Sequence, residues 1–168
     1  SKYAITKNKL KYDKLKILII SEYDIGGQIT TFPFIYNLKK IFPNSLIYNP
    51  WIGFIDKKIG YNNITKDLFI KNNIFSDDIT NFNDIKNTHF DIIFDLQLNV
   101  KNSLYFKYKF NTNIFMSVSA NFILSSIRVK NNIKYHFNSV YKKQRIHRYL
   151  SLINTFLEID NCPIKINI

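Results

Sequence analysis

Two adjacent glycines, in a chain with four in all, lie in the stretch SEYDIGGQITT from Ser21 to Thr31. The pair follows an apolar run and precedes a helical pattern, which predicts a tight turn that lets a ligand approach the backbone. The start of the helix offers N–H groups and a partial positive charge that attract phosphates or carboxylates. A glycine pair is also typical of a simple turn, and the spacing matches neither the dinucleotide fingerprint nor the P-loop. The candidate ligand-binding residues of this stretch are Gly26, Gly27, Gln28, Thr30 and Thr31.

A second group of polar residues follows the apolar run FDIIFD, in the stretch DLQLNVKNS. Asp95 is expected to hold the loop backbone together. Gln97 either hydrogen-bonds a ligand or caps the strand. Lys101 either meets a ligand phosphate or carboxylate as a point charge, or is an ordinary solvated lysine.

Other reactive residue types point away from several kinds of site. His89, His136 and His147 lie far apart without an i, i+4 partner, so a metal site has little support. Cys162 is the single cysteine of the sequence, which excludes an internal disulfide and fits a reducing compartment.

The charge balance favours an anionic partner. Lysine and arginine total 24 against 12 acidic residues, a net charge of +12, which suggests nucleic acid, anionic lipid or phosphorylated sugars as partners. The abundance of Lys, Asn and Ile is also typical of an A/T-biased genome, which accounts for part of the excess. The sequence has no apolar stretch of the roughly 18 residues that a membrane helix requires.

Strand-like and helix-like segments alternate along the chain. Strands are expected over 14–20, 45–50, 90–97 and 112–119, and helices within 72–90, after Asn99 and over 139–159. Residues 51–64 are expected to form a loop or a short helix. Because proline is tolerated only in a first turn, Pro33 predicts a helix that begins near Thr30 or Thr31.

This alternation predicts an α/β, Rossmann-like, doubly wound domain with a mainly parallel sheet. We expect a basic lead-in over 1–14, the domain itself over 15–160, and the start of a linker over 161–168. Ligands of such sheets bind beyond the carboxyl ends of the strands, where both polar stretches would lie.

Three blocks, in order, resemble glycosyltransferase family 9, the lipopolysaccharide heptosyltransferases. The first is KILIISEYDIGGQITTFPFIYNLKKIFPNSLI, the second HFDIIFDLQLNVKNSLYF followed by TNIFMSVSA, and the third QRIHRYLSLINTFLEI. The residues that carry the resemblance are Gly26, Thr30, Thr31, Pro33, Leu38, Phe42, Pro43, Asp91, Asp95, Leu96, Gln97, Lys101, Arg148, Tyr149, Leu150 and Leu157.

The resemblance implies the amino-terminal half of a GT-B enzyme. In the family this domain binds the acceptor, the anionic inner core of lipopolysaccharide, and a second domain binds the nucleotide-sugar donor, usually ADP-heptose. The resemblance implies that neither a metal nor a cofactor is required. It also implies a cytoplasmic location at the inner face of the inner membrane, with peripheral membrane contact.

The chain departs from the family where the chemistry occurs. The family's aspartate, the expected general base, aligns with Gly27, which cannot accept a proton. Asp24, three residues earlier, is the candidate substitute; a capping or exposed loop residue is the alternative. Leu98 and Gln144 replace a family glycine and histidine. The sequence therefore leaves open whether the chain is an enzyme. The alternatives are a degenerate, non-catalytic binding domain of the same fold, or a nucleic-acid-binding domain suggested by the charge and by YFKYKF, which also fits a strand.

Overall fold

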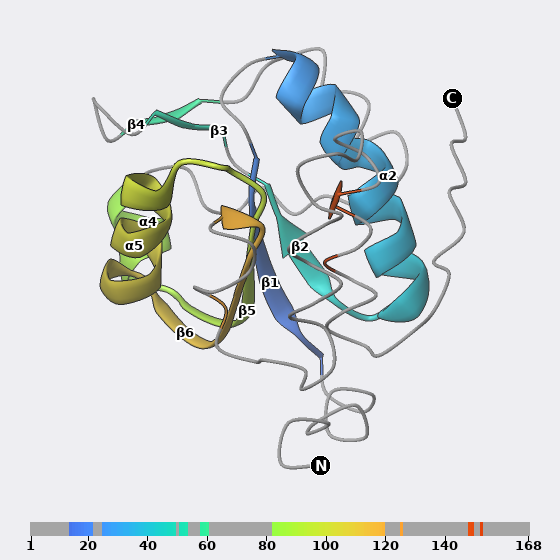
Figure 1. Ribbon diagram of the computed structural model, residues 1–168. Helices are drawn as coiled ribbons and strands as arrows, with labels where there is room; N and C mark the ends of the chain where they lie inside the picture. Colours follow the sequence, from blue (N-terminus) through green and yellow to red (C-terminus); the bar gives the residue numbers. More distant parts are fainter. Residues whose placement is uncertain are drawn as a thin grey trace.

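Short runs of β-branched and aromatic residues form a four-stranded sheet in which every strand is parallel to its neighbours (Figure 1). The computed structural model describes residues 14–21, 25–49, 51–53, 58–60, 82–119, 125, 148–149 and 152. The spatial order of the strands is β2-β1-β5-β6. Their bounds are Lys16–Ile20 for β1, Leu46–Tyr48 for β2, His89–Asp95 for β5 and Asn111–Ser117 for β6. These strands confirm the four segments expected from the sequence.

Helices cover both faces of the sheet. Helix α2 (Ile25–Ile41) lies on one face, and α4 (Phe82–Asn87) and α5 (Val100–Lys109) lie on the other (Figure 1). After β1 the chain turns to one side to form β2, and later it returns to the other side of β1 to form β5. The point where the winding reverses therefore lies between β1 and β5. The predicted α/β, doubly wound arrangement with a parallel sheet is confirmed.

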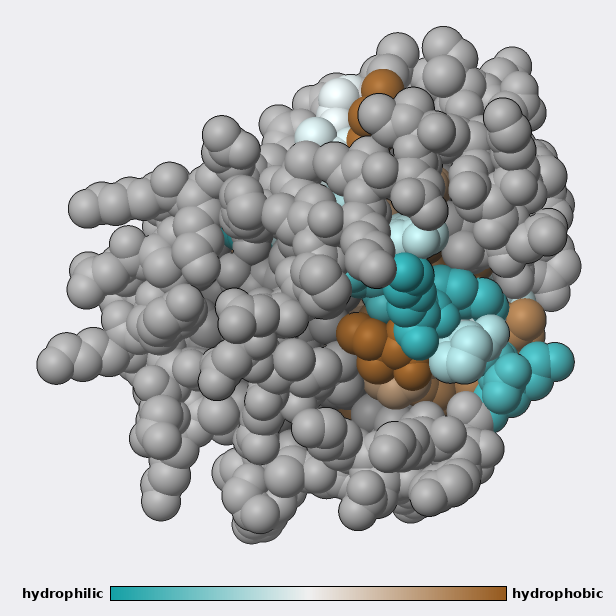
Figure 2. Space-filling model, turned by 90° about the vertical axis from the view of Figure 1, so that its right-hand side faces the viewer, coloured by the Kyte–Doolittle hydropathy of each residue, from teal (hydrophilic) through white to brown (hydrophobic). Residues whose placement is uncertain are grey.

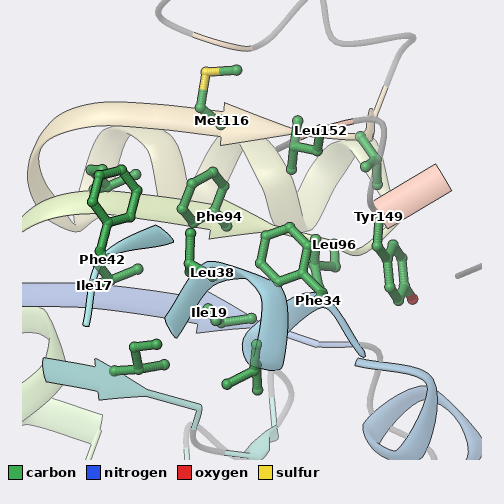
Figure 3. Close-up of a cluster of buried hydrophobic side chains, with 14 of the residues drawn as sticks. Ile17, Ile19, Phe34, Leu38, Phe42, Phe94, Leu96, Met116, Tyr149 and Leu152 are labelled. Atoms are coloured by element: carbon green, nitrogen blue, oxygen red, sulfur yellow. The ribbon is translucent and has the colours of Figure 1, made fainter. Parts of the chain in front are cut away.

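The alternation of side chains along β1 produces two cores. Ile17 and Ile19 pack under α2, whereas Leu18 and Ile20 pack under α4 and α5. Figure 3 shows the α2-side cluster, in which Phe34 and Leu38 of α2 lie beside Ile19 of β1 and Phe94 of β5. A run buried on both faces has to be apolar at every position, as KILII nearly is.

Residues near the end of the chain complete the α2-side core. Arg148, Tyr149 and Leu152 are helical, and Tyr149 and Leu152 are fully buried in the cluster with Phe34 (Figure 3). This agrees with a helix within 139–159, whose other residues lie outside the described part. Residues 1–13 and 161–168, which contain most of the expected lead-in and the expected linker, also lie outside it.

The predicted start of α2 is wrong. The helix begins at Ile25, and Pro33 lies in its interior. Proline has no N–H to donate to the carbonyl of Ile29, four residues earlier. Burial of the surrounding apolar side chains overrides this loss, since Phe34 and Ile35 have at most 1 % of their surface exposed. The Asn37 amide also donates to the carbonyl of Pro33 at 2.7 Å.

Residues 51–64 also differ from the expectation. Trp51–Gly53 forms β3 and Lys58–Gly60 forms β4, and the two pair antiparallel, apart from the main sheet. The sequence pattern did not predict these two strands, because each has only three residues. The YFKYKF segment, which also fitted a strand, belongs to α5 except for Phe110.

The α2 side of the molecule carries hydrophilic residues directly beside hydrophobic ones (Figure 2). Among the described residues, no helix combines the length and the apolar character needed to cross a bilayer.

Candidate functional site

Polar side chains gather at the carboxyl ends of the four parallel strands. Each strand ends in, or is directly followed by, buried polar residues, although the strand residues just before them are buried and apolar. These residues are Ser21 after β1, Asn49 after β2, Asp95 and Gln97 at the end of β5, and Ser117 and Ser119 at the end of β6. Buried polar groups need hydrogen-bond partners, so their arrangement decides what this edge can do.

Asp95 is the centre of the arrangement. It is fully buried, and its carboxyl is hydrogen-bonded to the hydroxyl of Ser103 on α5. It also accepts from the Ser117 hydroxyl at 2.8 Å and from the backbone N–H of Gln97 at 3.1 Å. The prediction that Asp95 holds the loop backbone is confirmed.

A chain of three short contacts runs from Asp95 through two serines to a backbone carbonyl. The Ser103 and Ser119 hydroxyl oxygens are 2.7 Å apart, and the Ser119 hydroxyl donates to the carbonyl of Gln97 at 2.7 Å. With the Asp95–Ser103 contact this makes three links, and each link needs one proton. The two hydroxyls supply only two. With Ser103 donating to Asp95 and Ser119 donating to the Gln97 carbonyl, no proton is left for the contact between the two hydroxyls.

The electrostatic environment of Asp95 favours the neutral carboxyl. Burial raises the pKa of the Asp95 carboxyl to about 6, although the hydrogen bonds from Ser103, Ser117 and the Gln97 backbone oppose the rise. Burial removes the hydration of the charged carboxylate, and this destabilises the charged form more than the three donated hydrogen bonds stabilise it. The neutral carboxyl is therefore favoured at mildly acidic pH.

Gln97 connects neighbouring strands. Its side-chain amide donates to the carbonyl of Ser21 at 3.0 Å, and its oxygen accepts from the Asn102 amide at 3.4 Å. The Ser21 hydroxyl in turn donates to the side-chain oxygen of Asn49 at 2.9 Å. The ends of β2, β1 and β5 are thus joined by side-chain hydrogen bonds. Of the two roles expected for Gln97, these contacts describe the structural one.

The prediction that the glycine pair forms a tight turn before the helix is wrong, because Gly26 and Gly27 lie within the first turn of α2 itself. Gly26 is exposed and Gly27 is buried. The hydroxyl of the half-buried Thr30 donates to the carbonyl of Gly26 at 2.8 Å, and the buried Thr31 donates to that of Gly27 at 2.7 Å. The N–H groups of a first turn have no partner within their own helix. Asp24 and the side chain of Gln28 lie outside the described residues.

The two candidate stretches follow adjacent strands, since β1 pairs directly with β5. Gly26 and Thr30 at the start of α2, and the exposed Lys101 in the first turn of α5, therefore belong to the same edge of the sheet. We call the buried polar residues at the strand ends the floor of this edge, and we call Gly26, Thr30 and Lys101 its rim. The described residues hold no cluster of three or more His, Cys, Asp or Glu side chains able to bind a metal ion.

Comparison of the chain with protein-family models, with curated proteins and with solved structures gives no match. The resemblance to glycosyltransferase family 9 therefore rests on the residues quoted above, and what it implies is a hypothesis. The fold and the polar edge are established independently of it.

Sequence reasoning missed the serines that surround Asp95. Ser117 and Ser119 alternate at the end of an apolar strand, and this pattern could have marked them as buried polar partners. Ser103 lies on α5, four residues after Asn99, and only the tertiary fold brings its side chain to Asp95. Arg148 was also missed as a candidate ligand, because it was noted only for the resemblance. Its Nε is buried and has no hydrogen-bond partner in the part of the chain that the structure describes.

The position of α5 depends on a cap that can be tested. Asn99 precedes the helix in an extended conformation, and its side-chain oxygen accepts from the backbone N–H of Asn102 at 3.0 Å. Asn99→Ala should lower the free energy of unfolding by about 1 kcal/mol, because a first-turn N–H loses its acceptor. Asn99→Asp, which keeps that acceptor, should leave stability unchanged in urea unfolding. An equal loss in both variants would show that the cap does not hold the helix start.

Proposed function

We propose that this chain is the acceptor-side domain of a glycosyltransferase, and that it binds an anionic saccharide at the carboxyl edge of its parallel sheet. The observation that carries the proposal is the placement of its two candidate stretches. They follow β1 and β5, the neighbouring strands at which the winding of the sheet reverses. Ligands of open α/β sheets bind in the crevice at this position.

The rim and the floor of the edge have different roles in this proposal. The exposed Gly26 allows close approach to the first turn of α2, and the positive end of that helix favours an anionic group. Lys101 adds a positive charge on the β5 side. The hydrogen bonds of Asp95 and Gln97 fix the loop that leads to Lys101, so the rim is positioned before a ligand arrives.

Arg148 is a further candidate ligand of an anionic group. It precedes Tyr149, which Figure 3 shows at the end of the core toward which the strands point, beside Leu96. The Nε–H of Arg148 is buried and has no hydrogen-bond partner among the described residues, and a buried polar group of this kind calls for an explanation. A phosphate or carboxylate of the acceptor would satisfy it, because guanidinium groups bind such anions in a planar fork.

The described residues fit binding better than proton transfer. Gly27 stands where the family has its general base, and Asp95 is fully buried and occupied by its own partners. Transfer would therefore depend on Asp24 and on a second GT-B domain that carries the nucleotide-sugar donor, ADP-heptose in the resembling family. The proposed location is the cytoplasmic side of the inner membrane, where such an acceptor is assembled.

Calorimetric titration of the chain with a phosphorylated inner-core oligosaccharide tests the proposal. We expect saturable binding to the saccharide and none to ADP-heptose. Lys101→Ala should weaken the saccharide affinity about 5- to 10-fold, because a charge-assisted contact contributes on the order of 1 kcal/mol or more. Lys109→Ala, an equal loss of charge at the other end of α5, is the control and should change it less than about 2-fold. Absence of saccharide binding, or equal effects of the two variants, would refute the proposal.

The degenerate, non-catalytic domain is the second candidate, and the Gly27 departure favours it. It predicts the same saccharide binding without sugar transfer when the donor-binding half is supplied. Transfer that is lost in Asp24→Asn, with saccharide affinity unchanged, would instead favour the enzyme.

A further inference from the structure

Helix α5 carries a row of exposed apolar side chains on its outer face. Val100, Leu104 and Tyr108 are 43 %, 38 % and 72 % exposed. Their i, i+4, i+8 spacing places them in one line along the helix. Ser103 and Phe106, which face the sheet, are fully buried. The row therefore points away from the core that α5 covers.

Lysines border this row. At about 100° per residue, Lys107 lies on one side of the row and Lys109 on the other. The Lys107 ammonium is 5.8 Å from the centre of the Tyr108 ring. The sequence of α5, VKNSLYFKYK, contains three lysines and no acidic residue. The outer face is thus an apolar strip with positive margins, on a protein whose net charge is +12.

We propose that the outer face of α5 docks on an anionic lipid bilayer. The occupant must provide negative charge over the margins and an apolar phase under the row, and a bilayer with anionic headgroups provides both. Val100 and Leu104 enter the acyl boundary, Tyr108 lies at the headgroup level, and the lysine stems reach back to the phosphates. A nucleic acid would pair with the lysines but would leave Val100 and Leu104 without an apolar partner. This inference does not rest on saccharide binding.

Docking in this way has a geometric consequence. Helix α5 starts directly after the Gln97–Asn99 loop, so Val100 adjoins the carboxyl edge of the sheet. A bilayer under α5 would lie beside the candidate site.

Vesicle co-sedimentation of the full chain tests the proposal. We expect binding to vesicles of 30 % phosphatidylglycerol in phosphatidylcholine, weak binding to pure phosphatidylcholine, and loss of binding as sodium chloride rises to 0.5 M. Lys107→Glu with Lys109→Glu should reduce the partition coefficient at least about 30-fold. The control pair, Lys14→Glu with Lys40→Glu, makes the same charge change at exposed positions away from α5 and should reduce it less than about 3-fold.

The apolar row is tested separately, with the charge unchanged. Leu104→Ser should reduce partitioning about 5- to 10-fold. A polarity-sensitive label on Tyr108→Cys, in a Cys162→Ser background, should shift to the blue on vesicles, whereas the same label on Lys40→Cys should not. Circular dichroism checks that each variant is folded.

Three results would overturn the proposal. The first is equal loss of binding in the two double variants, which would show that only net charge matters. The second is absence of binding to anionic vesicles by the wild-type chain. The third is stronger binding to random oligonucleotides that depends on the same lysines, which would assign the surface to nucleic acid.

Discussion

Phe94→Ala should lower the free energy of unfolding by about 3–5 kcal/mol, a large part of the 5–15 kcal/mol typical of a domain. Phe94 is fully buried in β5, and its ring meets that of Phe34 on α2 edge to face at a centroid distance of 5.2 Å. Truncation removes the apolar surface and leaves a cavity between the sheet and α2. Urea unfolding, followed by far-ultraviolet circular dichroism, measures the loss.

Two variants show whether the effect comes from this contact. Phe94→Leu keeps most of the volume and should cost clearly less than Phe94→Ala. Tyr108→Ala removes an aromatic side chain that is 72 % exposed, and its effect should lie within about 0.5 kcal/mol. A double-mutant cycle of Phe34 and Phe94 should give a coupling of about 0.5–1.5 kcal/mol. A loss below 1 kcal/mol for Phe94→Ala would contradict the packing of α2 on the sheet.

Asp95→Asn should make stability less dependent on pH. In the folded chain the pKa of Asp95 is about 6, against an ordinary value of 3.8. The folded state thus holds a proton that the unfolded state releases between these values, so the wild-type contribution is full below about pH 3 and is lost as the pH rises through the folded pKa. The loss amounts to about 3 kcal/mol.

The amide cannot ionise, yet its side-chain oxygen can still accept hydrogen bonds from Ser103 and Ser117. Relative to wild type, Asp95→Asn should therefore gain about 3 kcal/mol of unfolding free energy between pH 3 and pH 7. The comparison of the two proteins at each pH cancels the titration of other groups. Asp84→Asn, at an exposed position of α4, controls for the loss of one acidic group. A wild type that gains stability relative to the amide as pH rises would show that the three donors hold a carboxylate.

Much of the fold was predictable because its signals are local. KILII is apolar at nearly every position, as is typical of a strand buried on both faces. This segment forms β1. The same holds for HFDIIFD and β5. The start of α2 was not predictable from local rules, because the cost of Pro33 is offset by contacts of Phe34 and Ile35 with residues far away in the sequence.

The candidate site was predictable only in part, for a related reason. Asp95 and Gln97 stood out because polar residues ended an apolar run, and Asp95 does hold its loop. Their partners Ser103, Ser117 and Ser119 come from two other elements, and the burial that favours a neutral Asp95 exists only in three dimensions. The local pattern thus identifies Asp95 and Gln97, which lie at the centre of the hydrogen-bond network. It does not identify the serines, which only the tertiary fold brings to them.

The proposed saccharide-binding surface is the carboxyl edge of the sheet. Amide chemical-shift mapping during titration with a phosphorylated inner-core oligosaccharide is the experiment that decides this assignment. We predict saturable shifts of Gly26, Thr30, Asn99 and Lys101, with none at Lys16 and Asn111 on the amino edge. Shifts confined to the amino edge or to the outer face of α5, or no saturable shifts at all, would contradict it.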